Sequence, residues 1–324
     1  VRARWDVNQD TPFQAETPAG ANPPDGAIIY YYLKSGSPAE NIKLEIHDKQ
    51  GHLVRSFSHV AESEPKLPAN APEYWFAKQP SLSKNAGLNR FAWDLCYPHP
   101  ETLPYSYYGN LIDYVEYTLP DHAIPGETPR YQPPGPLVAP GEYEVALTVD
   151  GKTYRQTVTV KSDPRVKATQ SDLDAQLAIA ESIARQMQVS ASMFYQVHDL
   201  RAMVAERKKA LAGDSSAGDA KSAIDALHEK LGKLESGKRG EPGFGMINRD
   251  QARLITMVES ADVRPSQTAE QTAEGLCSAL NKDLAAWREV NQKDIPSINA
   301  LLEKYKVGAL KVAAHIPAEQ QCGS

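Results

Sequence analysis

The residues best suited to contact a ligand are aromatic, and most of them lie in one proline-rich segment. Tyr105, Tyr107 and Tyr108 follow closely on one another, and Trp75 precedes them. Exposed aromatic rings stack on sugar faces, and tyrosine adds a hydroxyl group to its flat apolar ring. We take these four as candidate ligand-binding residues. Packing of the same rings against the chain's own strands or a neighbouring domain stays open as the alternative.

Carboxylates near this segment suggest a second chemistry, the hydrolysis of glycosides. Glycoside hydrolases use two carboxyl groups, one as acid and one as nucleophile or base. The candidates are Asp94, Glu101, Asp113, Glu116 and Asp121. The separation that matters is a distance in space, so closeness in the sequence identifies no pair. Asp94 follows Trp93 at the end of an expected strand and is better explained as a turn residue, so no catalytic residue is assigned.

The histidines form no recognisable metal-binding pattern. His47, His52 and His59 come from one expected hairpin, and their alternation with apolar residues places them mainly on the solvent side. One hairpin seldom supplies all the donors that a metal ion needs. The sequence also holds no nucleophile elbow, phosphate-binding loop or His-Glu-x-x-His motif. We therefore predict neither a metal nor a cofactor.

The three cysteines do not suggest a disulfide framework. Cys96, Cys277 and Cys322 share no metal-ligand spacing, and an odd number leaves at least one thiol outside any disulfide. We expect Cys96 and Cys277 to act as small apolar residues and Cys322 to be a thiol in a polar tail.

Composition and charge exclude several classes of partner. The chain of 324 residues carries 35 Lys+Arg against 41 Asp+Glu, a net charge of −6. A general nucleic-acid binder would show a basic surface instead. No run of about 18 apolar residues occurs, so we expect no membrane span.

The chain divides into two differently built halves. Of the 24 prolines, 19 precede residue 141, and 13 of the 15 tyrosines precede residue 155. The residues up to Pro164 carry the whole net charge of −6, whereas the remainder is neutral. At roughly 150 residues per domain, the length also suits two domains. We place the boundary near Pro164.

The first half has the pattern of an Ig-like or fibronectin-like β-sandwich. We expect residues 1–26 to form an irregular linker from a missing upstream region, and the sandwich to cover 27–162 with a Pro/Tyr-rich insertion at 97–140. Alternating apolar residues predict hairpins at 42–58 and 142–160, the second turning at Asp150-Gly151. In the strand near 87–94, either Leu88, or Phe91 and Trp93, face inward.

The second half has the pattern of an antiparallel helical bundle, over 163–307. Apolar residues in steps of three and four predict a helix from Ser171, its N-cap, to about Ala212. Further helices are expected at 219–235, near 247–261 and after Ser266, and Pro296 should kink or restart the last one. The tail 308–324 shows no interpretable pattern. Together, the two halves predict an all-β domain followed by an all-α domain.

Several segments in order resemble one protein family. They are NPPDGAIIYYYL at 22–33, LEIHDKQGHLVRSF at 44–57, GLNRFAWDL at 87–95, APGEYEVALTVDGKTY at 139–154 and DPRV at 163–166. The series is similar to the C-terminal region of large bacterial sortilin-like β-propeller proteins with BNR-type repeats, often labelled glycosyl hydrolases. The β-part also resembles the Ig-like domain of flagellar hook-capping proteins. The propeller's own Asp-box motif does not occur here, so none of its residues can be carried over.

The resemblance implies an exported protein, periplasmic, at the cell surface or extracellular, although the chain shows no signal peptide. The upstream β-propeller would be its partner, with a glycan or another protein as a further contact. The first hypothesis is a non-catalytic C-terminal accessory module. The alternatives are part of a glycoside hydrolase whose active site is shared with the propeller, and a carbohydrate-binding module. Whether the chain is enzymatic stays open, and fold analogy is a weak argument for activity.

Overall fold

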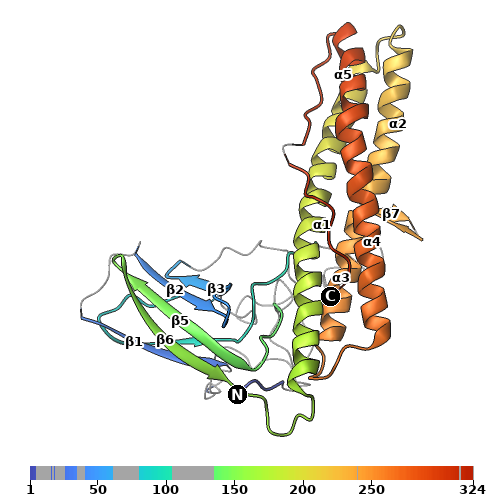
Figure 1. Ribbon diagram of the computed structural model, residues 1–324. Helices are drawn as coiled ribbons and strands as arrows, with labels where there is room; N and C mark the ends of the chain where they lie inside the picture. Colours follow the sequence, from blue (N-terminus) through green and yellow to red (C-terminus); the bar gives the residue numbers. More distant parts are fainter. Residues whose placement is uncertain are drawn as a thin grey trace. The chain divides into compact units, whose positions relative to one another are not determined.

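The protein combines antiparallel sheets with helices, as a computed structural model shows (Figure 1). The residues described are 1–4, 16, 18, 26–34, 41–60, 80–103, 135–238, 240–313 and 315–323. They form two compact units. Unit 1 takes its described residues from 1–100, 104–181 and 255–265, and unit 2 from 101–103, 182–254 and 266–324. Each unit therefore joins segments that lie far apart in the sequence.

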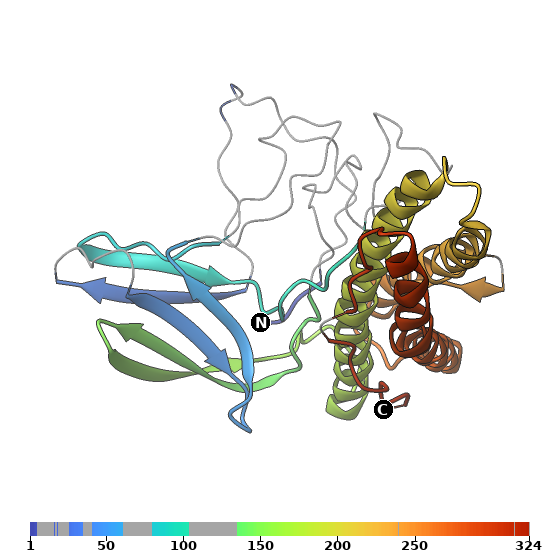
Figure 2. The same cartoon turned by 90° about the horizontal axis from the view of Figure 1, so that it is seen from above.

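The strands of unit 1 form two antiparallel sheets. β1 (Ala27–Leu33) pairs with β4 (Gly87–Trp93). The other sheet has the order β3-β2-β5-β6 and consists of β2 (Ile42–His47), β3 (Leu53–Ser58), β5 (Gly141–Val149) and β6 (Lys152–Val160). Figure 2 shows the two sheets as separate layers.

Both predicted hairpins are confirmed. β2 pairs with β3, and β5 pairs with β6 in unbroken register from Gly141↔Val160 to Val149↔Lys152. Asp150 and Gly151 have φ values of 48° and 77°, the positive values that a type I′ turn requires. The twist of this turn matches that of the flanking strands, which is why the Asp-Gly pair predicts the hairpin.

The two sheets share one hydrophobic core. Trp93 is fully buried with its ring centroid 5.6 Å from that of Tyr143, and the rings of Phe57 and Phe91 lie 4.7 Å apart. Phe91 and Trp93 therefore face inward, and Leu88 faces solvent at 71% exposure. Burial raises the pKa of Tyr143 to about 12, consistent with a dry core.

A buried arginine network closes unit 1. Arg2 is 1% exposed, and its guanidinium lies 2.7 Å from Asp262, 2.9 Å from Gln176 and 3.0 Å from the carbonyl of Val138. The Nε atom of Arg4 donates to the same Asp262 carboxylate at 2.6 Å. A buried charge is costly unless it is paired and hydrogen-bonded, so these contacts hold the first residues against distant parts of the chain.

The long helix α1 (Gln170–Leu211) begins with a cap that the sequence analysis placed wrongly. Thr169, and not Ser171, is the capping residue. Its Oγ1 accepts from the backbone N–H of Asp172 at 3.2 Å, and the carboxylate of Asp172 accepts from the N–H of Thr169 at 2.9 Å. This reciprocal pattern is a capping box, and it satisfies two donors where Ser171 would satisfy one. The end near residue 212 is confirmed.

Unit 2 consists mainly of helices that share one hydrophobic cluster. They are the C-terminal part of α1, α2 (Gly218–Glu235), α3 (Phe244–Val258, to residue 254), α4 (Gln267–Glu289), the π-helix η2 (Val290–Asp294) and α5 (Ile295–Lys304). A short hairpin, β7 (Gly237–Lys238) with β8 (Glu241–Pro242), connects α2 to α3. Figures 1 and 2 show α2, α4 and α5 alongside α1.

The expected starts of α4 and α5 are confirmed, whereas α3 begins at Phe244 and ends at Val258, about three residues before the predicted bounds of 247 and 261. Ser266 caps α4 by accepting from the N–H of Ala269 at 3.2 Å, and Pro296 lies in the first turn of α5, after the π-helical segment. No helix in the described part of the chain has both the length and the apolar character that crossing a bilayer requires.

The expectation for Cys277 and Cys322 was wrong, because the two form a disulfide. Their Cα atoms lie 5.6 Å apart, across a sequence separation of 45. A bond that closes a loop of this size restricts the unfolded chain and contributes about 3–5 kcal/mol to stability in the chain-entropy model. Cys96 is not part of a disulfide, and its Sγ lies 3.5 Å from the carbonyl oxygen of Asp94.

The arginine network predicts a large loss of stability on removal of its shared carboxylate. Asp262→Ala leaves the buried Arg2 without its anion, and we expect the free energy of unfolding to fall by about 3–5 kcal/mol. The control is Arg155→Ala, which breaks the exposed ion pair with Glu144 and should cost less than about 1 kcal/mol. Urea unfolding of the two variants measures both values. Equal losses would contradict the importance of the buried network.

A half-buried carboxyl in α4, that of Asp283, predicts a pH dependence. Burial raises the pKa of Asp283 to about 7, although neighbouring Lys282 lowers it. The folded state therefore binds this proton more tightly than the unfolded state. Its contribution is present at low pH and is lost as the pH rises through about 7.

Asp283→Asn should accordingly stabilise the protein at pH 8 relative to wild type, and this advantage should shrink at pH 5. Denaturant unfolding at the two pH values measures the difference. The exposed Glu274→Gln, on the same helix, is the control. An advantage of the same size at both pH values would show that the charge of Asp283 is not the cause.

Candidate functional site

The four predicted ligand-binding residues, Trp75, Tyr105, Tyr107 and Tyr108, lie outside the described residues. The same holds for the carboxylates Asp113, Glu116 and Asp121. All of them stay predictions.

The two described carboxylates each bind a neutral donor. Oδ1 of Asp94 accepts from the N–H of Cys96 at 3.0 Å, the contact expected of a turn residue, and Leu95 between them has a φ of 63°. Oε2 of Glu101 accepts from Gln188 at 2.8 Å. Asp94 belongs to unit 1 and Glu101 to unit 2.

The histidines of the first hairpin do not form a metal-binding cluster with other described residues. His52 is exposed, with its Nδ1 atom 3.1 Å from the Asp48 carboxylate, and His47 and His59 are half-buried. Among the described residues, no three His, Cys, Asp or Glu side chains gather where they could hold a metal ion.

A histidine and a carboxylate meet in unit 2, at the end of α2. Nδ1 of His198 lies 2.6 Å from Glu235, which also accepts from Arg201. Burial raises the pKa of Glu235, but the hydrogen bonds from His198 and Arg201 outweigh this effect and lower it. The carboxylate is thus held as an anion between two donors. This arrangement fastens α1 to the end of α2.

Among the described residues of unit 1, the outer face of the β1–β4 sheet has an unusual composition, and we call it the tyrosine face. Ile28, Tyr30 and Tyr32 alternate outward along β1, with exposures of 44%, 59% and 67%. Across the ladder, Tyr30 pairs with the exposed Arg90, and Tyr32 pairs with the exposed Leu88. The face therefore presents two aromatic rings, two aliphatic side chains and one guanidinium.

This composition departs from the usual pattern of an antiparallel sheet. Such sheets commonly pack one face on the core and present polar residues on the other. In β1 both faces are apolar, because Tyr31 and Leu33 are buried on the inner side. Contiguous exposed apolar groups mark interaction sites more often than scattered ones do. The run of apolar residues at 27–33 carried this signal, but apolar residues on both faces of a strand hide which face is exposed.

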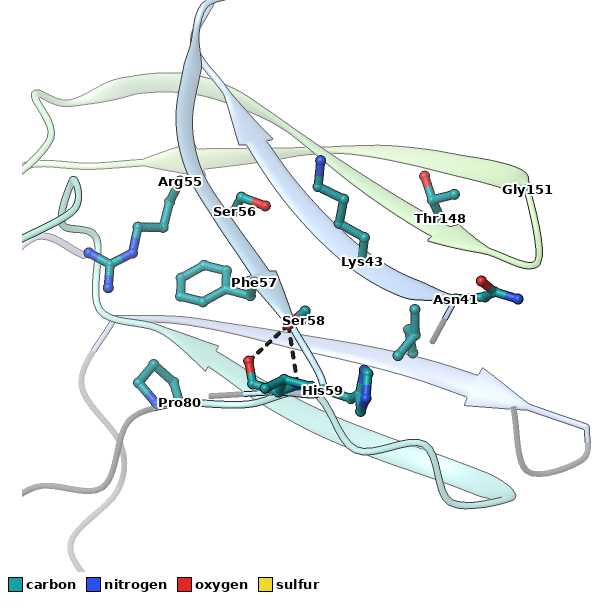
Figure 3. A pocket seen from close by; sticks show the side chains of 12 residues that line it. Asn41, Lys43, Arg55, Ser56, Phe57, Ser58, His59, Pro80, Thr148 and Gly151 are labelled. Atoms are coloured by element: carbon teal, nitrogen blue, oxygen red, sulfur yellow. Dashed lines mark hydrogen bonds between the residues drawn. The ribbon is translucent and has the colours of Figure 1, made fainter. Parts of the chain in front are cut away.

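A cavity of about 510 Å³ lies along β3 at the edge of the four-stranded sheet (Figure 3). Arg55 and Lys43 are the arginine and lysine side chains that line it. Arg55 donates to the carbonyl of Tyr97 and lies over the Phe57 ring at 5.3 Å, and Lys43 pairs with Glu45 at 2.7 Å. Both cations are therefore engaged by the protein itself, and the cavity is a weaker candidate than the tyrosine face.

Comparison with known proteins identifies no relative: no family model, curated protein or solved structure matches this chain. The resemblance to sortilin-like proteins therefore stays an expectation from the sequence segments. The tyrosine face must be interpreted from its own chemistry.

The alternation along β1 predicts that substitutions of neighbouring tyrosines differ in their effect on stability. Tyr31→Ala removes a ring that is 7% exposed and a hydroxyl that donates to Ser83 at 2.5 Å, so we expect a loss of about 3–5 kcal/mol. Tyr30→Ala and Tyr32→Ala should each change the free energy of unfolding by about 0.5 kcal/mol or less. Thermal or urea unfolding distinguishes them. A comparable loss in all three would mean that Tyr30 and Tyr32 are structural.

Proposed function

We propose that this chain is a non-catalytic accessory module of an exported protein, which docks another protein domain through its tyrosine face. The observation that carries the proposal is the exposure of Ile28, Tyr30, Tyr32 and Leu88 on one sheet face. In this interpretation the β-part is an Ig-like sandwich and the helical part an antiparallel bundle. Two antiparallel sheets with one core, and helices with another, support it.

The chemistry of the face favours a protein partner. Tyrosine and arginine are enriched among the residues that dominate protein–protein binding, and the aliphatic Ile28 and Leu88 suit a dry contact. A sugar-binding surface would place more hydrogen-bonding side chains around its aromatic rings. The resemblance to sortilin-like proteins suggests an upstream β-propeller as the partner domain.

The disulfide supports the proposed export. Structural disulfides persist in the periplasm and in extracellular compartments, whereas cytosolic thiols are generally kept reduced. The Cys277–Cys322 bond therefore fits a protein that matures in an oxidising compartment.

The test is binding to a separately expressed β-propeller domain of the sortilin-like type, the proposed partner. Calorimetry should detect binding by the wild-type chain and about 30-fold or more weaker binding by Tyr30→Ala/Tyr32→Ala. Tyr154→Ala is the matched control, because Tyr154 is 52% exposed on β6, outside the tyrosine face. We expect this control to bind as wild type does.

Two results would overturn the proposal. Equal binding by the wild type and the double variant would remove the tyrosine face from the contact. A glycan array on which the wild type and Tyr154→Ala bind one sugar class, but the double variant does not, would show that the face is a carbohydrate-binding surface instead.

A further inference from the structure

The chain after α5 forms an extended segment, which we call the C-terminal strap (residues 307–313 and 315–323). It has neither helical nor strand structure. Leu310 is 3% exposed, and Val307, Ala313 and Ile316 pack against the same hydrophobic cluster of unit 2. Contact at every third residue is the period of a polyproline II helix. Figure 1 shows the strap, in dark red, beside the helices of unit 2.

Two asparagines of the helices bind the main chain of the strap with both ends of their amide groups. Asn299 donates to the carbonyl of Leu310 at 3.0 Å and accepts from its N–H at 2.7 Å. Asn281 makes the same pair of bonds to Gln320, at 2.9 and 2.7 Å. A side-chain amide carries one donor side and one acceptor side, so it can pair with a peptide group as a neighbouring strand would.

Further contacts between these two clamps also use the main chain of the strap. Asn291 accepts from the N–H of Ala313 at 2.7 Å, and its own amide is fixed by donation to the carbonyl of Trp287 at 2.8 Å. Arg288 donates to the carbonyl of Pro317. Residue numbers along the strap fall as those along α4 and α5 rise, so the strap runs antiparallel to these helices.

The surface of α4, η2 and α5 that holds the strap, which we call the groove, therefore binds an extended peptide by its main chain and by an apolar side chain at every third position. The strap is tied at its far end by the Cys277–Cys322 disulfide. At its near end, Lys306 (φ 55°) is the left-handed residue that ends α5: its N–H donates to the carbonyl of Glu303, and the N–H of Val307 donates to the carbonyl of Leu302, as in a Schellman C-cap. The strap thus leaves the helix through one short connection, and a segment attached in this way can exchange between identical copies.

We propose that this groove is a peptide-binding site whose second occupant is the C-terminal strap of another copy of the chain. The strap of a second copy has the same sequence, so it can satisfy both asparagine clamps and the apolar positions in the same way. The strap can thus lie on its own chain or on a second copy, and the disulfide fixes one of these arrangements. Formed within a chain, it holds the strap in place; formed between chains, it links an exchanged dimer.

The exchange requires the disulfide to open, by ordinary thiol–disulfide chemistry. A dithiol reductant attacks one sulfur of the bond, then closes its own disulfide, and leaves Cys277 and Cys322 as thiols. The strap is then held by non-covalent contacts alone and can move between copies. A small oxidised disulfide, such as oxidised glutathione, takes up the two electrons in the reverse reaction and fixes whichever arrangement is present.

The test uses the full wild-type chain in two isotopic forms, unlabelled and uniformly ¹⁵N-labelled. The two are mixed, reduced with dithiothreitol, and reoxidised with oxidised glutathione at several protein concentrations. Mass spectrometry of the digest identifies the Cys277–Cys322 peptide pair and its labels. We expect mixed-label pairs, and a tenfold rise in protein concentration should raise the ratio of mixed to same-label pairs by up to about tenfold at low occupancy of the dimer.

Two outcomes would overturn the proposal. Mixed-label pairs that stay at background at every concentration would show that the strap returns only to its own chain. A second measurement tests the groove itself: Asn299→Ala should slow reformation of the Cys277–Cys322 bond by about tenfold, because two hydrogen bonds to Leu310 are lost. The control Gln292→Ala changes an exposed residue of η2. Equal rates for the two variants would mean that thiol collision, and not the groove, directs the pairing.

Discussion

The buried guanidinium of Arg2 is the constraint on which the arrangement of unit 1 depends. A charge with 1% exposure is tolerable only where anions and carbonyl groups surround it, and those groups come from widely separated parts of the chain. Asp262 supplies the anion, Gln176 in α1 supplies an amide oxygen, and Val138 supplies a carbonyl. Satisfying one side chain thus fixes where the first residues, the start of a helix and a loop before α4 lie within the unit. The same side chain of Gln176 donates to the carbonyls of Val258 and Ala261, which extends the network into the backbone.

The parts of the fold that could be predicted are those set by local chemistry. Asp150-Gly151 gives the backbone conformation of its turn wherever the strands lie, and Ser266 caps α4 through a contact three residues away. The pairing of Cys277 with Cys322 depends instead on the tail returning to α4, which no local pattern reveals. The inward and outward faces of β1 were equally hidden, because apolar residues occupy both.

Recognition of main chain by side-chain amides explains why the strap gave no signal in the sequence. The side chains of Asn281 and Asn299 form hydrogen bonds to peptide groups, which every residue possesses, so these contacts require no particular residue type in the strap. Only the apolar contacts leave a trace, and their period of three is neither that of a strand nor that of an α-helix. Val307, Leu310, Ala313 and Ile316 follow this period and were overlooked for that reason. The candidate site shows a related gap: the tyrosines of the proline-rich segment were predicted to bind a ligand, with packing as the alternative, whereas the tyrosines of β1 were not predicted to form a binding surface.

The distance between Arg2 and its anion also has a consequence during protein synthesis. The two residues are separated by 260 positions, so at bacterial or eukaryotic translation rates Asp262 leaves the ribosome roughly 10–50 s after Arg2. During this interval the strands of the first half are complete, but the site that receives the guanidinium is not. The nascent chain must therefore keep its first residues exposed until most of the helices exist. A protein built in this way completes unit 1 only after residues 182–254 of unit 2 have been made, although the strands of unit 1 precede them in the chain.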